Sequence, residues 1–154
     1  MKKSFTGYKR NDGSVGIRNK LLVVSITGLT GPTARKISNF LEGSLFVDNP
    51  YGGGIIGEDK IRQDRAIIGF AKNPNIGAVL IISADPPKGH YIKSQLENSL
   101  KPIELLTLDD CGGTSIQETL ALIEEQGVAS LEIFPYPENE CETQPDDATI
   151  EAAA

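Results

Sequence analysis

The stretch Ala78-Val79-Leu80-Ile81-Ile82 is the most apolar run in the chain, and it decides the fold. Short apolar runs that are rich in β-branched residues predict buried strands and not helices. A run of the same kind, Leu21-Leu22-Val23-Val24-Ser25-Ile26, precedes it in the sequence. The shorter runs 45–47 and 103–108 complete a set of four predicted strands.

Segments with a helical spacing of apolar residues separate these strands. The predicted helices are a segment from Pro32 to Gly43, the segments 58–72 and 88–99, and one that starts at Thr114; a last strand is predicted over 129–134. This alternation predicts a three-layer, Rossmann-like α/β domain with a mainly parallel sheet of four or five strands and helices on both faces. Right-handed crossovers place every strand-to-helix loop at one edge of that sheet, where ligands bind in such folds.

The length and the charge distribution predict one folded domain with a tail. A chain of 154 residues has the usual length of a single domain, which we place at 1–135, with a basic segment at 1–20. After Lys101 the sequence has no Lys or Arg. Its end, 136–154, is acidic, broken by prolines and poor in apolar residues, so we expect a flexible tail. The tail is either a spacer or an acidic arm that docks on the basic segment or on a partner.

Composition argues against several classes of function. A net charge of -6 argues against nucleic-acid binding. No apolar stretch approaches the roughly 20 residues that a membrane-spanning helix needs, so no membrane association is expected. The basic start is not followed by the apolar region of a secretory signal, and the two cysteines, Cys111 and Cys141, are best explained as cytosolic thiols. We therefore expect a cytoplasmic protein.

The loops at the predicted functional edge contain three candidate catalytic residues. Asp85 and His90 follow the third predicted strand, and Cys111 follows the fourth, next to Asp109 and Asp110. Carboxylate, imidazole and thiol groups can transfer protons or act as nucleophiles. The alternative for His90 is a surface histidine on a helix. A helix N-terminus would lower the pKa of the Cys111 thiol, whereas the two adjacent carboxylates would raise it.

The N-terminal segment carries the most specific motif. Gly7-Tyr8-Lys9-Arg10-Asn11-Asp12-Gly13-Ser14-Val15-Gly16-Ile17-Arg18-Asn19 resembles the opening of the core domain in the altronate dehydratase and galactarate dehydratase family. The resemblance continues through 70–80 and through Gly112-Gly113-Thr114, and covers about residues 5–126. It implies a hydro-lyase that dehydrates sugar acids, with iron(II) or manganese(II) as cofactor; a related sulfolactate lyase eliminates sulfite.

This motif also predicts a binding site for a small hydroxy acid. The guanidinium groups of Arg10 and Arg18 suit a carboxylate, and Asp12 and Asn19 suit the hydroxyl groups of a polyol. The resemblance adds Gly112, Gly113 and Thr114 to the predicted substrate-binding residues, although helix capping also explains Thr114. We expect the arginine-containing segment and the loop edge to form one pocket. The alternative is that Asp12-Gly13 is a tight turn and that the arginines pair with surface acids.

The sequence departs from the family pattern in ways that leave the function open. It lacks the usual Cys after the first strand, the His and Gly-Cys of the second loop, and the Gly-Cys-Glu that Ser83-Ala84-Asp85 replaces, so the metal ligands are unknown. The family also continues well beyond this length. We therefore expect a lyase subunit completed by a companion chain, or a homo-oligomer. The alternatives are a non-catalytic module that binds small acids or regulates, and a distinct nucleotide- or cofactor-binding domain.

Overall fold

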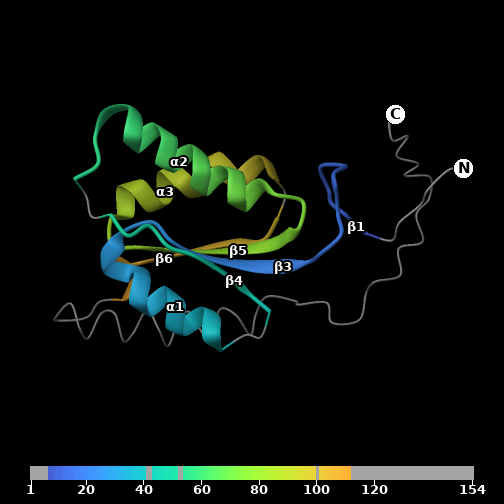
Figure 1. The fold of residues 1–154 in the computed structure, drawn as a ribbon, viewed down its shortest axis with the longest axis horizontal. Helices are drawn as coiled ribbons and strands as arrows, with labels where there is room; N and C mark the ends of the chain where they lie inside the picture. The colour runs from blue at the N-terminus through green and yellow to red at the C-terminus, as the bar shows by residue number, and fades with distance from the viewer. Residues whose placement is uncertain (1–6, 41–42, 52–53, 100, 112–154) are drawn as a thin grey trace, which may run out of the picture.

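A computed structural model describes residues 7–40, 43–51, 54–99 and 101–111 of the chain (Figure 1). Its centre is a four-stranded sheet in which every neighbouring pair of strands is parallel. In spatial order the strands are β4 (Leu45–Val47), β3 (Lys20–Ser25), β5 (Ile76–Ser83) and β6 (Ile103–Thr107). The prediction of a parallel α/β sheet is confirmed.

Helices cover both faces of this sheet. Figure 1 shows α1 (Gly31–Asn39) on one face, and α2 (Gly57–Lys72) and α3 (Pro86–Leu96) on the other. Alternate residues of β3 enter different cores, because successive side chains of a strand point to opposite faces. Leu21 and Val23 pack in the cluster that contains residues of α1, and Leu22 and Val24 pack in the cluster that contains residues of α2 and α3.

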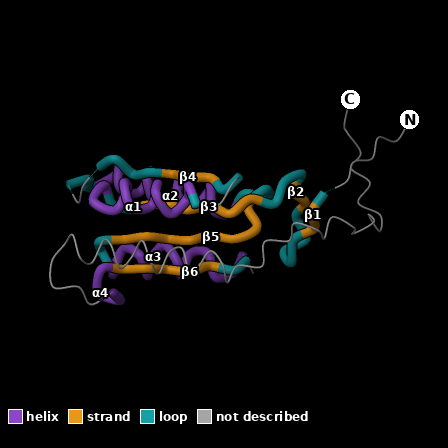
Figure 2. Tube along the Cα trace, turned by 90° about the horizontal axis from the view of Figure 1, so that it is seen from below, coloured by secondary structure: helices purple, strands orange, loops and turns teal. Residues whose placement is uncertain are grey.

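The strand order creates a switch point between β3 and β5. From β3 the chain moves outward to β4, then returns past β3 to β5 and continues to β6, as Figure 2 shows with the four strands side by side. The connections that follow β3 and β5 therefore leave in opposite directions. In open parallel sheets the crevice at the carboxyl ends of such a strand pair is where ligands bind.

Several element boundaries differ from the predicted ones. Helix α3 begins at Pro86 and not at residue 88, because Asp85 caps its N-terminus. A short 3-10 helix, η1 (Gly28–Thr30), precedes α1, and a second, η2 (Glu97–Ser99), follows α3. Strand β6 ends at Thr107, where the short helix α4 (Leu108–Cys111) begins. The predicted helix from Thr114, the predicted strand 129–134 and the expected tail lie outside the described residues.

A hairpin that the sequence analysis did not predict stands before the sheet. Its strands are β1 (Tyr8–Lys9) and β2 (Val15–Gly16), which pair antiparallel. The turn between them contains Gly13 at φ 84°, a left-handed conformation that glycine adopts without strain. Figures 1 and 2 place the hairpin beyond the amino ends of β3 and β5, at the opposite end of the sheet from the loops that follow these strands. The tight turn at Asp12-Gly13 is therefore observed.

Within the part of the chain that the structure describes, no helix has the length and apolarity to span a lipid bilayer.

Gly77, near the start of β5, gives a test of this architecture. A Cβ atom built there would overlap the side chain of Asn19, coming within 2.9 Å of its Cγ atom. We expect Gly77→Ala to lower the free energy of unfolding by about 1–3 kcal/mol, measured by urea denaturation. Gly69→Ala is the matched control, because open space surrounds that helical position and alanine is the better helix former. Equal stability of the two variants would contradict the close approach at Gly77.

Candidate functional site

Hydrogen bonds join three loops at the carboxyl edge of the sheet. The Nδ2 atom of Asn49, after β4, donates to the backbone carbonyl of Ile26, after β3, over 2.9 Å. The amide of Ala84, after β5, donates to the Oγ1 atom of Thr27 over 3.1 Å. The hydroxyl groups of Ser25 and Thr30 lie 2.8 Å apart. The rim of the switch point is therefore a connected polar surface.

Asp85 lies at this rim and its contacts are those of a helix cap. Its Oδ1 atom accepts a hydrogen bond from the backbone amide of Lys88 over 3.1 Å, in the first turn of α3. The Oγ atom of Ser83 donates to the backbone carbonyl of Asp85 over 2.7 Å and accepts from its amide over 3.0 Å. The exposed carboxylate still faces solvent, so its predicted catalytic role stays a prediction.

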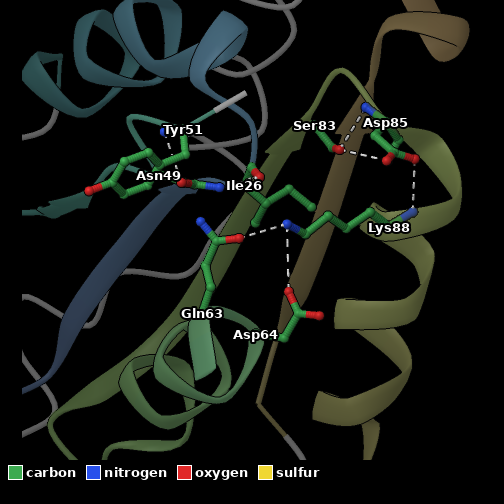
Figure 3. Close-up of polar contacts among 8 residues, drawn as sticks. All are labelled: Ile26, Asn49, Tyr51, Gln63, Asp64, Ser83, Asp85 and Lys88. Carbon is green, nitrogen blue, oxygen red and sulfur yellow. Dashed lines mark hydrogen bonds and ion pairs between the residues drawn. The ribbon is translucent and has the colours of Figure 1, made fainter. Parts of the chain in front are cut away.

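Lys88 is a partly buried cation near this rim, and the sequence analysis did not select it. Its Nζ atom donates to the Oε1 atom of Gln63 over 3.0 Å and lies 3.6 Å from the Oδ1 atom of Asp64 (Figure 3). The side chains of Lys88 and Asp64 are only 15% and 10% exposed. Because burial removes water from both ions, each depends on the other for its charge compensation.

The position of Lys88 in the sequence contains a signal that could have identified it. A lysine in the first turn of a helix opposes the helix dipole, which favours negative charge there. Lys88 directly follows the two prolines that begin α3, so this position could be read from the sequence. Its partner Asp64 could not, because the two residues meet only when α2 packs beside α3.

The other two predicted catalytic residues lie on helices at this edge, His90 on α3 and Cys111 on α4. His90 is exposed on α3. Asp110 accepts hydrogen bonds through its Oδ2 atom from the amide and the hydroxyl of Thr107, over 3.0 and 2.7 Å. Cys111 ends α4, and its side chain, like Gly112, Gly113 and Thr114, lies outside the described part of the structure.

The described residues do not fit the divalent metal that the family resemblance implies. Across 7–40, 43–51, 54–99 and 101–111, no three side chains of His, Cys, Asp or Glu come together in a way that could hold an ion. We therefore assign no step of a reaction to a metal.

Arg10, a predicted substrate-binding residue, fastens the hairpin to the amino edge of the sheet. Its Nε atom donates to the carbonyl of Pro74 over 2.7 Å, and its Nη2 atom to the carbonyl of Arg18 over 3.0 Å. Its Nη1 atom donates to the Oδ1 atom of Asn19 over 2.7 Å. Burial lowers the pKa of Arg10 from its usual value, although the nearby Asp12 opposes this effect. We call this arrangement of Arg10, Asn19 and Pro74 the hairpin clasp.

Other residues of the motif continue this structural pattern. The Oδ1 atom of Asn75 accepts from the amides of Ile17 and Arg18, over 2.9 and 3.1 Å. The Oδ1 atom of Asp12 accepts from the hydroxyl and the amide of Ser14 inside the turn, and these hydrogen bonds lower the pKa of the Asp12 carboxyl. The side chain of Arg18 is exposed.

The structure separates two groups of residues that we expected in one pocket. The hairpin clasp contacts Pro74, just before β5, whereas Asp85 lies just after that strand. The eight residues of β5 span about 26 Å at roughly 3.3 Å per residue. Within this chain the expectation of a shared pocket is therefore wrong, because the hairpin packs at the amino ends of the strands and the loop edge is at their carboxyl ends.

The comparisons with known proteins agree with the family motif of the N-terminal segment. The model of the family described as "D-galactarate dehydratase/Altronate hydrolase, second domain" matches residues 7–129. The chain is thus a domain of the dehydratase and lyase class, and it belongs to the D-galactarate dehydratase/altronate hydrolase family. The predicted family resemblance is confirmed.

Curated relatives give the same assignment. The chain is 31% identical over 110 residues to "(2R)-sulfolactate sulfo-lyase subunit beta" of Chromohalobacter salexigens, a match that covers 71% of this chain and 28% of the relative. It is 33% identical to "Altronate dehydratase" of Escherichia coli K12 (49% of this chain, 17% of the relative) and 22% identical to that of Bacillus subtilis 168 (84% and 27%). The chain therefore spans less than a third of these relatives. No solved structure matches it.

The cap at Asp85 gives a prediction about stability. Asp85→Ala removes the acceptor for the amide of Lys88, so we expect a loss of about 1 kcal/mol in the free energy of unfolding by urea denaturation. Asp85→Asn keeps a side-chain oxygen at the same place and caps nearly as well, so it is the control that should retain stability. The cap would have no energetic role if Asp85→Ala were as stable as the wild type.

Lys101 gives a prediction about pH. Its Nζ atom donates to the carbonyls of Ala71 and Asn73, over 3.0 and 2.7 Å, and burial, together with the charge of Arg10, lowers its pKa from 10.5 to about 8. Between these values the unfolded chain binds more protons than the folded one, so this group makes stability rise with pH. The stability of the wild type relative to Lys101→Met should therefore increase from pH 8 to 10, measured by denaturant titration at each pH.

Lys60→Met is the matched deletion of an exposed lysine on α2. A difference between wild type and Lys101→Met that stays constant over this pH range would contradict the lowered pKa.

Proposed function

We propose that this chain is one component of a lyase that eliminates water from a small hydroxy acid, and that a companion chain completes the active site. The observation that carries the proposal is the family match over residues 7–129. One relative is named as a subunit, which supports an enzyme made of more than one chain.

In this proposal the carboxyl edge of the sheet holds the substrate. Elimination next to a carboxylate removes a proton from the adjacent carbon, and a fixed cation stabilises the negative charge that develops. Lys88 suits this task, because an ammonium group has three donors and Gln63 accepts from one of them. Its pairing with Asp64 holds the ammonium group in place before substrate binds.

Proton transfer in this proposal belongs to groups around the same rim. Asp85 and His90 lie near the N-terminus of α3, both exposed and therefore accessible to a substrate or to a companion chain. Cys111 follows β6 at the same edge. Iron(II) or manganese(II), where the reaction requires it, would be held by ligands from the companion chain or from residues outside the described ranges.

A second candidate is a non-catalytic module that binds a small acid. Two observations favour it: Asp85 is engaged as a helix cap, and Arg10 is engaged in the hairpin clasp. Both residues have a structural explanation that needs no reaction. Both candidates predict that the isolated chain binds a small acid. Only the lyase component predicts that the complex with its companion forms a product.

Ligand binding by the isolated chain tests the role of Lys88. We expect galactarate, altronate or sulfolactate to raise the melting temperature of the wild type, since a ligand at a hundred times its dissociation constant adds about 2.7 kcal/mol. Lys88→Met should weaken binding at least about tenfold, which corresponds to about 1.4 kcal/mol. Lys88→Met leaves Asp64 buried and without its ion pair, which can destabilise the fold. The double variant Lys88→Met/Asp64→Asn removes both charges, so we expect it to stay folded. Lys60→Met, at an exposed position of α2, is the control.

Unchanged binding by both Lys88 variants would exclude this lysine as the carboxylate anchor. The reaction itself is tested by purifying the chain with its natural partner and measuring keto-acid formation, with and without iron(II) or manganese(II). Keto acid formed by the complex supports the lyase component. If the complex binds the acid but forms no keto acid, the result supports the non-catalytic module.

A further inference from the structure

A groove of about 450 Å³ lies along the β4 edge of the sheet, on the half of the molecule away from the loop rim. Its apolar walls come from β3, β4, β5 and α2: Leu22, Leu45, Phe46, Val47, Phe70 and Ile76. Arg18 and Lys20 add two positive charges, and none of the described residues that line it is acidic. We call this feature the β4 groove.

The β4 groove is an unusual surface for a small soluble domain. Among the described strands β4 pairs only with β3, so its outer edge is open, as Figures 1 and 2 show. Three large apolar side chains at the groove are exposed to solvent: Leu45 by 44%, Phe70 by 55% and Ile17 by 62%. Exposed apolar patches that include charged groups mark sites of interaction with another segment or protein.

The chemistry of the β4 groove specifies its occupant. Two cations and no carboxylate among the described lining residues favour an acidic segment. Walls that include Phe46 and Phe70 favour apolar or proline-rich residues, because extended proline-containing segments dock in grooves lined by aromatic rings. The occupant is thus an extended segment with both acidic and apolar residues.

We propose that residues 132–142 of this same chain dock in the β4 groove. They read Glu132-Ile133-Phe134-Pro135-Tyr136-Pro137-Glu138-Asn139-Glu140-Cys141-Glu142, which combines three large apolar side chains with four carboxylates and no positive charge. Prolines restrict the backbone to extended conformations, so less entropy is lost on docking. The segment begins after residue 129, where the match to the family domain ends.

The length of the chain permits this contact. Twenty residues, 112–131, separate Cys111 from the segment, and at about 3.3 Å per residue they reach up to about 66 Å. A domain of 100 residues has a radius of gyration of only about 13 Å, so the segment can reach the β4 groove. Because both partners are in one chain, their effective concentration is in the millimolar range, and modest contacts are enough. This inference does not depend on the proposed enzymatic function.

Cys141 provides the probe for a direct test in the 154-residue chain. A nitroxide spin label is attached to Cys141 in a Cys111→Ser variant labelled with nitrogen-15. We expect the label to reduce the amide signals of 45–47, 70, 73, 75 and 76, while the signals of 88–90 in α3 keep their intensity. Cys141→Ser labelled at Cys111 is the matched control, in which the groove signals should recover. Ionic strength near 1 M, where the Debye length is about 3 Å, should also weaken the effect.

Charge reversal at the β4 groove tests the electrostatic part of the proposal. Arg18→Glu/Lys20→Glu should abolish the loss of signal at the groove, whereas Lys60→Glu/Arg65→Glu, a reversal at exposed positions of α2, should leave it in place. Full groove signals in the labelled chain would overturn the proposal. So would a loss of signal that appears only when spin-labelled chains are mixed with separate nitrogen-15 chains, because the occupant would then be a second copy.

Discussion

Burial of β3 and β5 on both faces is the constraint on which the rest of this structure depends. Both faces of the sheet present apolar side chains that are at most 1% exposed: Leu21, Leu22, Leu80 and Ile81. Helices must therefore pack on each face to cover them. Parallel pairing of the two strands then requires a crossover after each of them. This places every strand-to-helix loop at one edge, and leaves the amino ends of the strands to be closed by something else.

The hairpin clasp closes those amino ends. The arginine motif therefore lies at the amino edge of the sheet, apart from the polar groups of the carboxyl edge. Arg10 uses its donors on backbone carbonyls and on Asn19, so the most recognisable motif of the family is accounted for by structure. The carboxyl edge instead carries hydroxyl groups, the exposed Asp85 and the buried pair of Lys88 and Asp64. The predicted role of this motif in substrate binding stays a prediction, because these contacts show only how it holds the hairpin.

The family assignment and the open surfaces of the domain belong together. The chain spans less than a third of its curated relatives, whose matched part is a single domain among others. The domain has two surfaces that can make contacts beyond its own core, the β4 groove and the loop rim. They lie on different parts of the same sheet, so each can be occupied without blocking the other.

The sequence by itself determined the strands, most of the helices, the parallel sheet and the family, because hydrophobic periodicity and a long local motif are properties of neighbouring residues. It placed Asp85 at the carboxyl edge of the sheet, because this residue directly follows a predicted strand. Only the tertiary structure decided that Arg10 fastens a hairpin about one strand length away, and that Lys88 meets Asp64. Such contacts join residues distant in sequence, and they depend on how helices and strands pack, which no local pattern specifies.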